Sequence, residues 1–398
     1  MIKSVSLQTT NIDDMEQAVS DLASQLREKL SLLRNSVGIV QCDPEFVEAG
    51  IMPLLHDALG IDMVGGTTVS VATNDIIGNH IFSLMVLTSD DVEFYTGHTN
   101  GVLEDCDAAI ERAMCPGLDA AKLPLGLALI FPTVADSERM PGDCYVEATM
   151  RVCGDVPVFG TLSVDDTLQD FDRSMSVHNS EAFARETTFV LMFGDVKPKF
   201  FVATVPRYDD ATFSNVVITK SDDNIVQEIN NMTTVKFFES VGMADDGALK
   251  PGVRLLAYTV THSGKDGVSR SFVRALSDVD ENGHGLFRGK VPVGSTLTVE
   301  SPGADDILDA TIRVMQQIAQ VDDAQAVLIY SCIVRQLLVG ADTLKELAHV
   351  KDTLQSNVPF VASYSGGEIG PIGCGCDRGR CDKSINAFHN YSLIACVL

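Results

Sequence analysis

Hydrophobic positions along the chain follow two patterns, a helical spacing and the short apolar runs of buried strands. Both patterns occur in residues 12–87. Apolar side chains recur every three or four positions between residues 12 and 33, which predicts an amphipathic helix. Short apolar runs predict buried strands. Asp43 before Pro44 is typical of the start of a second helix. These patterns predict a helix at 12–33, a strand at 37–41, a helix from Asp43, a glycine-ended strand at 63–66 and a returning strand at 82–87.

The same order recurs twice further along the chain. Each glycine-ended strand is followed by a His-Asn or Asn-His pair and a returning strand, at His178 and Asn179 in the second copy. Because any α/β protein alternates helices with strands, the order by itself is weak evidence of duplication. We nevertheless expect one shared β-α-β-β topology in three spans, residues 37–87, 127–193 and 327–397.

The middle of the chain has a different pattern. Residues 221–240 read as a helix, and the segments after it alternate apolar and polar positions between Gly- and Asp-rich turns. We expect an antiparallel meander with strands at 253–260, 269–276 and 295–300. The whole chain is therefore predicted to be a mixed α/β (α+β) protein of two domains with mixed sheets.

Polar residues follow two apolar strands in the last copy. Ser331, Cys332 and Arg335 come after the apolar run at 327–330, and Gly366 and Gly367 precede Glu368. Ligands of open α/β sheets bind at the carboxyl ends of strands. We expect Ser331, Cys332, Arg335 and Glu368 to meet in one pocket, where the arginine and glutamate would suit a zwitterion.

The last copy also carries the motifs of a known family. Ser-Cys-x-x-Arg at 331–335, Gly-Glu at 367–368 and Phe-His-Asn-x-Ser at 388–392 resemble the carboxyl-terminal domain of the FIST family of intracellular signal-transduction sensory proteins. Turns at 289–295 and 64–68 resemble family turns as well. Val69 and Ser70 stand where family members often carry Gly-Glu, which weakens any site in the first copy. The resemblance implies a FIST N-like domain at 1–205 and a FIST C-like domain at 206–398.

The resemblance implies a sensory protein that binds a small ligand, with amino acids as the suggested class. A separate partner, such as a kinase, cyclase or receptor, would read the signal, because no output domain is recognised in the chain. The expected ligand-binding residues are Ser331, Cys332, Arg335, Gly366, Gly367, Glu368, His389 and Asn390.

Each candidate also has a structural interpretation. Arg335 can equally form a structural pair with Glu368 or a helix carbonyl. His389 and Asn390 suit backbone-bonding roles better than catalysis. Cys332 can be a nucleophile activated by Arg335, which would make the protein a hydrolase or transferase, but a buried thiol is the commoner case. A ligand-free interaction scaffold is the third alternative.

Three further cysteines lie close together in one loop. Cys374, Cys376 and Cys381 are weak metal candidates, because structural zinc sites use four ligands and mostly Cys-x-x-Cys spacing. His389 is available as a fourth ligand, yet we expect no tightly bound metal here. The sequence also lacks a phosphate-binding loop, a Rossmann glycine motif, His-Glu-x-x-His and Gly-x-Ser-x-Gly. We therefore expect no cofactor and no enzymatic activity.

Charge and hydropathy limit the partners. The chain has 398 residues with 29 basic and 55 acidic side chains, a net charge of −26. Such a protein is expected to repel nucleic acids and anionic membranes. Neither a signal peptide nor an apolar run of membrane-spanning length is recognised. Free cysteines within apolar segments agree with a reducing compartment, so we expect a cytoplasmic protein.

Overall fold

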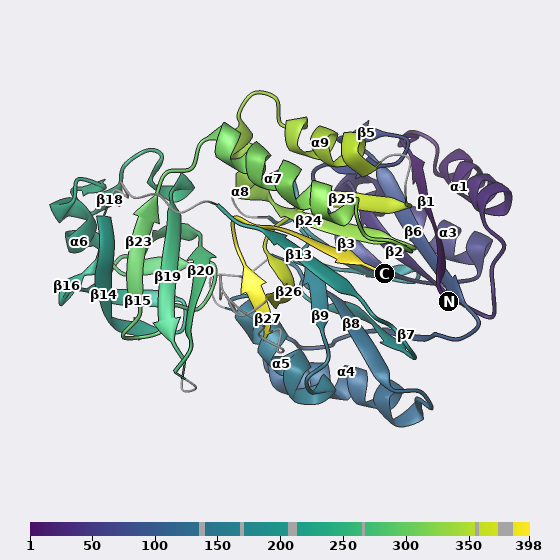
Figure 1. The fold of residues 1–398 in the computed structure, drawn as a ribbon, viewed down its shortest axis with the longest axis horizontal. Helices are drawn as coiled ribbons and strands as arrows, with labels where there is room; N and C mark the ends of the chain where they lie inside the picture. Colours follow the sequence, from purple (N-terminus) through teal and green to yellow (C-terminus); the bar gives the residue numbers. More distant parts are fainter. Residues whose placement is uncertain (135–139, 168–170, 206–212, 265–266, 355–357, 373–384) are drawn as a thin grey trace.

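The computed structural model describes residues 1–134, 140–167, 171–205, 213–264, 267–354, 358–372 and 385–398. Two bodies are visible in it (Figure 1). The larger body contains both chain termini and three similar units, and the smaller body is a sheet formed by the middle of the chain. The predicted mixed α/β fold is confirmed.

The first unit begins at the N-terminus. Asp14 caps its first helix by accepting a hydrogen bond from the N–H of Gln17, and the apolar stripe of that helix is buried. Asp43 caps the next helix, as its place before Pro44 predicts. The elements are β1 (Lys3–Thr9), α1 (Met15–Lys29), β2 (Asn35–Cys42), α2 (Pro44–Glu48), α3 (Ile51–Leu59), β3 (Asp62–Thr67), β4 (Val71–Thr73), β5 (Ile77–Gly78) and β6 (Phe82–Ser89).

The second unit repeats this order with one helix in place of α2 and α3. Asp105 caps its first helix through the N–H of Ala108. The elements are β7 (Glu93–His98), α4 (Cys106–Ala120), β8 (Leu125–Phe131), α5 (Asp143–Cys153), β9 (Val158–Thr161), β10 (Ser176–His178), β11 (Glu181–Phe183) and β12 (Thr188–Phe193).

The third unit is interrupted by the middle of the chain, which is inserted after its first strand. The elements are β13 (Lys199–Ala203), α7 (Ala304–Ile318), β24 (Val327–Cys332), α8 (Ile333–Val339), α9 (Lys345–Leu354), β25 (Phe360–Ser365), β26 (Glu368–Ile372), β27 (Ile385–His389) and β28 (Leu393–Val397).

The three units have one strand order, which confirms the predicted shared topology. In each sheet the first strand pairs with the returning strand, which pairs with the central strand, which runs parallel to the glycine-ended strand. The sheet orders are β1-β6-β2-β3-β10-β11, β7-β12-β8-β9-β26-β27 and β13-β28-β24-β25-β4-β5.

The last two strands of each sheet come from another unit. Unit 2 gives β10 and β11 to the first sheet, unit 3 gives β26 and β27 to the second, and unit 1 gives β4 and β5 to the third. The exchange is cyclic, so each unit completes the sheet of a neighbour. Ile39, Leu129 and Leu328 of the three central strands also meet in one buried cluster. The larger body therefore has a core shared by all three units.

The smaller body is an antiparallel sheet with one short helix (Figure 1). Its strand order is β20-β19-β23-β14-β15-β22-β21, with β16 paired to β15. The elements are β14 (Phe213–Asp222), β15 (Ile225–Ile229), β16 (Met232–Thr233), α6 (Thr234–Ser240), β17 (Ala244–Asp245), β18 (Ala248–Leu249), a 3-10 turn (Val253–Leu255), β19 (Ala257–Ser263), β20 (Ser269–Arg274), β21 (Leu276–Val279), β22 (Gly285–Phe287) and β23 (Thr296–Glu300).

The predicted helix at 221–240 is wrong over most of its length. Asp223 has a positive φ of 48°, and Asn230 and Asn231 have positive φ as well, so two tight turns fold this stretch into strands. Asp and Asn tolerate that conformation better than other non-glycine residues. Only α6 (Thr234–Ser240), at the end of the stretch, is helical. The three antiparallel strands predicted after it are found as β19, β20 and β23, although residues 253–255 form a 3-10 turn. The predicted meander order is wrong, because β19 lies between β20 and β23.

Two sheets of the larger body span the predicted boundary near residue 205. The strand β13 lies before that residue and pairs with β28, and β4 pairs with β25. The third unit thus shares its sheet with the first, although most of it lies in the second half of the chain. Arg274 of the smaller body donates to Asp143 (3.0 Å) and to the carbonyl of Phe388 (2.9 Å), which joins the two bodies.

Candidate functional site

A cavity of about 580 Å³ lies where the smaller body meets the larger one. One wall comes from the smaller body and includes Arg254, Leu255, Ser277, Asp278 and Arg288. The opposite wall includes Phe171, Cys332, Val334, Leu337, Gly366 and Asn390. The cavity therefore contains three of the predicted site residues, Cys332, Gly366 and Asn390.

Cys332 lies at the carboxyl end of β24, as the apolar run before it predicts. Its N–H donates to the carbonyl of Ser392 (2.9 Å), which ties the end of the central strand to the turn before β28. The side chain is buried against the cavity wall. Burial and the neighbouring Glu368 raise the pKa of the thiol well above its usual range. At neutral pH the thiol is therefore uncharged, which disfavours its use as a nucleophile.

Arg335 does not line the cavity, so the prediction of one pocket for all four residues is wrong. Its side chain is fully buried and forms an ion pair with Glu346, with Nη2 2.6 Å and Nε 3.0 Å from Oε1. Nη2 also donates to Thr311, and Nη1 donates to the carbonyl of Tyr391. The guanidinium is held by groups inside the protein, because a buried charge needs such partners.

Ser331 belongs to the same buried network. Its hydroxyl donates to Oε2 of Glu346 at 2.8 Å, so Ser331 and Arg335 meet at Glu346 rather than at Glu368. Glu346 lies in the first turn of α9, and its side chain is completely buried. Order along the chain predicts that Arg335 pairs with Glu368. In the folded protein the carboxylate beside Arg335 belongs to Glu346 of α9.

Glu368 is buried at the start of β26, beside Cys332. Its Oε2 accepts a hydrogen bond from the N–H of Ser392 (3.3 Å), and its Oε1 has no hydrogen-bond partner among the described residues. Burial raises the pKa of this carboxyl well above its usual range, although the N–H of Ser392 and the charge of Arg335 act in the opposite direction. The raised pKa disfavours the charge that would hold a ligand ammonium group, and Glu368 does not line the cavity, so the expected zwitterion site is not formed.

We expect Glu368→Gln to stabilise the protein near neutral pH. The unfolded chain loses its Glu368 proton above about pH 4.5, while the raised pKa keeps the proton on the folded state. Because the folded state keeps this proton and the unfolded chain releases it, the free energy of unfolding falls as pH rises. Glutamine does not titrate, so the substitution removes this loss. Denaturant unfolding at pH 5, 6, 7 and 8 measures it: the gain should grow with pH. Glu346→Gln is the control and should destabilise. A Glu368→Gln variant less stable than wild type at pH 8 would contradict the assignment.

Gly366 and Gly367 allow a close passage of the chain behind the cavity. A side-chain carbon on Gly366 would lie 2.8 Å from Val134, and one on Gly367 would lie 2.4 Å from the ring of Phe388. The N–H of Gly366 donates to the carbonyl of Leu162 in unit 2 (2.9 Å). Their direct structural role is thus contact between units, and Gly366 also faces the cavity.

His389 and Asn390 have backbone partners. Nε2 of His389 lies 3.0 Å from the carbonyl of Gly370, and burial lowers the pKa of His389 to about 4. His389 lines a second, smaller cavity of about 300 Å³ rather than the first. Asn390 accepts a hydrogen bond from the N–H of Ala275 (3.2 Å) and so connects the two bodies at the first cavity. A ligand role for either residue stays a prediction.

Several cavity residues are not recognised in the sequence. Arg254 and Asp278 form an ion pair (2.5 Å) across the smaller body, and the guanidinium of Arg288 lies 5.8 Å from the ring centre of Phe171. These residues lie far from the motifs of the third unit along the chain. Because they are charged residues spread over separate elements of the smaller body, no local spacing distinguishes them.

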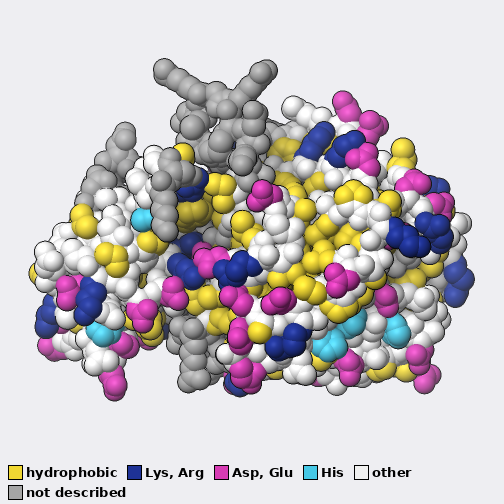
Figure 2. All heavy atoms as spheres, turned by 90° about the horizontal axis from the view of Figure 1, so that it is seen from below, with side chains coloured by type: hydrophobic (Ala, Val, Ile, Leu, Met, Phe, Trp, Pro, Cys, Tyr) yellow, Lys and Arg dark blue, Asp and Glu magenta, His cyan; other side chains and the backbone are white. Residues whose placement is uncertain are grey.

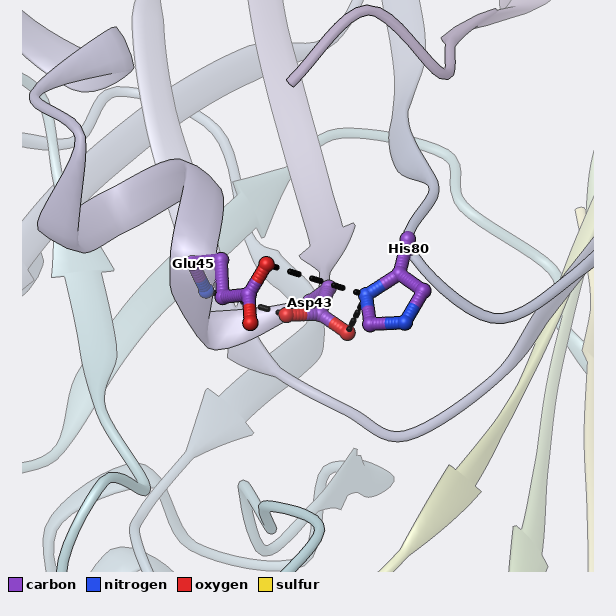
Figure 3. Close-up of side chains that lie close together, drawn as sticks. All are labelled: Asp43, Glu45 and His80. Atoms are coloured by element: carbon purple, nitrogen blue, oxygen red, sulfur yellow. Dashed lines mark hydrogen bonds and ion pairs between the residues drawn. The ribbon is translucent and has the colours of Figure 1, made fainter. Parts of the chain in front are cut away.

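A group of possible metal ligands lies in unit 1. Figure 3 shows Asp43 and Glu45 from the start of α2 facing His80 from the loop before β6. Nδ1 of His80 is 3.0 Å from Asp43 and 3.9 Å from Glu45, while the other oxygen of Asp43 caps α2. The ion pair accounts for this arrangement without a cation. The cysteine loop with Cys374, Cys376 and Cys381 lies outside the described residues.

Comparison with protein families identifies the chain. The FIST N domain model matches residues 36–232, and the FIST C domain model matches residues 242–371. These domains are sensory domains of signal-transduction proteins. The protein belongs to the FIST family. The family resemblance predicted from the motifs is confirmed, and β27 and β28, which complete the second and third sheets, lie beyond the matched residues.

Other comparisons add little. No curated protein matches the chain. Among solved structures, the crystal structure of cyanuic acid hydrolase from A. caulinodans is similar over 100% of this chain and 99% of that chain, with a TM-score of 0.37 and 9% identity. We draw no inference from a likeness of this size. Within the described part of the chain, no helix combines the length and apolar character needed to cross a membrane.

Proposed function

We propose that the protein is a sensor that binds a small carboxylate, amino acids among them, in the cavity between its two bodies, and signals to a separate partner. The observation that carries the proposal is the composition of the cavity, which combines two arginines with an apolar wall formed by the other body. Small-ligand sites in general combine a mainly apolar lining with a few polar groups that orient the ligand.

The charges favour an anionic ligand. The chain carries a net charge of −26, yet Arg254 and Arg288 both line this cavity. Figure 2 shows acidic and basic side chains spread over the face it views. Arg288 is the candidate for the ligand carboxylate, because its guanidinium lies 5.8 Å from the ring centre of Phe171, where the charged wall of the cavity faces the apolar one. A guanidinium can hold a carboxylate through two parallel hydrogen bonds.

The apolar part of the ligand would pack against Phe171, Leu255 and Val334. Phe171 and Val334 belong to the larger body and Leu255 to the smaller one, so a ligand here would contact both. A ligand shifts a conformational equilibrium when it binds one arrangement better than another. Occupancy would therefore change how the two bodies pack, and a kinase, cyclase or receptor outside this chain would read that change.

The uncharged thiol of Cys332 supports binding over covalent catalysis at this cavity. Nucleophilic cysteines have a lowered pKa, and burial has the opposite effect here. In this proposal the side chain of Cys332 contacts the ligand and takes no part in covalent chemistry.

The test is a thermal-shift screen of amino acids and small carboxylates, followed by calorimetry of each hit. A ligand at a hundred times its Kd should stabilise the folded state by about 2.7 kcal/mol. Arg288→Ala should weaken binding by about ten- to a hundredfold, because a hydrogen bond to a charged group contributes about 1.5–3 kcal/mol.

Arg313→Ala is the matched control, since Arg313 is an exposed residue of α7 outside the cavity lining. The Arg313→Ala variant should bind the hit with the same affinity as the wild-type protein. A hit whose affinity survives Arg288→Ala would mean that the ligand binds elsewhere. Turnover of the hit in the wild-type protein, lost in Cys332→Ser, would favour the hydrolase alternative.

A further inference from the structure

Two histidines lie close together where the β10–β11 hairpin of unit 2 joins the first sheet. His98 ends β7 of the second sheet, and His178 ends β10, which is paired to β3 in the first sheet. Their Nδ1 atoms are 3.0 Å apart, and their ring centres are 5.2 Å apart. Both side chains are half-buried, so an ion can reach them from solvent.

The separation of the two nitrogens fits a shared ion. Imidazole nitrogens bound about 2.0–2.1 Å from one zinc ion, at angles between octahedral and tetrahedral, lie roughly 2.8–3.4 Å apart. The alternative is a hydrogen bond between the rings, in which one Nδ1 carries the hydrogen. Binding a cation moves that hydrogen to the Nε2 atom of the same ring and leaves two Nδ1 lone pairs facing the ion.

The surroundings hold the rings in this orientation. Nε2 of His178 lies 3.2 Å from the hydroxyl of Thr96, a partner for the ring nitrogen that a metal leaves unused. Metal-binding histidines commonly anchor their second nitrogen in this way. The ring of His98 stacks on Phe183, with centres 4.3 Å apart. Asp62, Glu181 and His56 lie near enough to influence the charge of His178.

We propose that His98 and His178 form a binding site for a divalent transition-metal ion, Zn²⁺ in the first instance, that fastens the second sheet to the first. Imidazole ligands suit Zn²⁺, Cu²⁺ and Ni²⁺, whereas Mg²⁺ and Ca²⁺ prefer oxygen. Among the described residues no third His, Cys, Asp or Glu ligand atom lies within 4.8 Å of both nitrogens, so water would fill the remaining coordination positions. The site is separate from the cavity of the proposed function and does not depend on it.

The experiment uses the full chain with competing ligands removed. His80→Ala eliminates the Asp43–Glu45–His80 group, and Cys374→Ser, Cys376→Ser and Cys381→Ser eliminate the cysteine loop. In this background, titration calorimetry with ZnCl₂ should give about one bound ion per chain. ZnCl₂ should also raise the Tm, and chelator should reverse the rise, whereas MgCl₂ should do neither.

His98→Asn and His178→Asn are added one at a time. Asparagine keeps a polar group near the Nδ1 position and is a poor zinc ligand, so each variant should fold while its zinc affinity falls at least about tenfold. His349→Asn, on α9, is the matched control and should bind zinc as the background does. Zinc binding that survives both substitutions, or a background protein that binds no zinc, would overturn the proposal. Circular dichroism checks folding; if one variant is unfolded, the other decides.

Discussion

Replacing Arg335 by alanine should lower the free energy of unfolding by about 3–5 kcal/mol, because it leaves Glu346 buried and unpaired. Both side chains are completely inaccessible, and Glu346 also accepts hydrogen bonds from Ser331 and Thr311. Arg335→Lys should recover only part of the loss, since lysine cannot reproduce the contacts of the planar guanidinium. Chemical denaturation at pH 7 and low salt measures these differences.

A double variant distinguishes the ion pair from simple packing. Arg335→Met combined with Glu346→Leu removes both charges and keeps apolar bulk, so it should be much more stable than Arg335→Ala. If Arg335→Ala costs less than about 1 kcal/mol, the pair does not stabilise the fold and the side chain is available for another role. If ligand affinity changes in Arg335→Lys while stability does not, the residue acts on the ligand after all.

Gly160→Ala should destabilise the protein by more than about 4 kcal/mol, a loss large enough to show as poor folding. An added side-chain carbon would lie 1.8 Å from the carbonyl oxygen of Ile130 on the neighbouring parallel strand. Gly65 is in the corresponding place in unit 1, where the carbon would lie 2.0 Å from the carbonyl oxygen of Val40. Gly65→Ala should therefore have a similar effect.

Gly154→Ala is the control, because Gly154 has a positive φ of 74° but open space around it. Its cost should be about 1–3 kcal/mol from backbone strain alone, because its φ of 74° and ψ of −147° are rarely adopted by residues with a side chain. Thermal and urea unfolding of the three variants compares the two causes. Equal losses for Gly154→Ala and Gly160→Ala would mean that conformation, not contact with the neighbouring strand, explains the glycine-ended strands.

Local patterns in the sequence decided the elements of the larger body. Asp43 before Pro44 predicts the start of a helix, and α2 begins there, although a break at Gly50 divides the expected helix into α2 and α3. Apolar runs likewise predict the central strands. These features depend on residues close together in the chain, so their physics is visible in the sequence. The helix predicted at 221–240 failed because Asp223, Asn230 and Asn231 adopt turn conformations that composition does not reveal.

The sequence also determined the family and three residues of the candidate cavity. Polar groups and glycines after apolar strands predict Cys332 and Gly366, the family motif at 388–392 predicts Asn390, and the cavity contains all three. No local pattern distinguishes Glu368 from Glu346 as the partner of Arg335. Both are glutamates on neighbouring elements, and only the packing of α9 on α7 and β24 brings Glu346 to the guanidinium.

The cyclic exchange of hairpins was decided by tertiary structure alone. The strands β4, β10 and β26 are short, so nothing local shows that each will pair with the sheet of another unit. The same holds for the cavity, whose arginines come from the smaller body, and for the meeting of His98 with His178. Residues separated by tens of positions come together only when the units pack, because their pairing energy depends on surfaces that exist in the folded state.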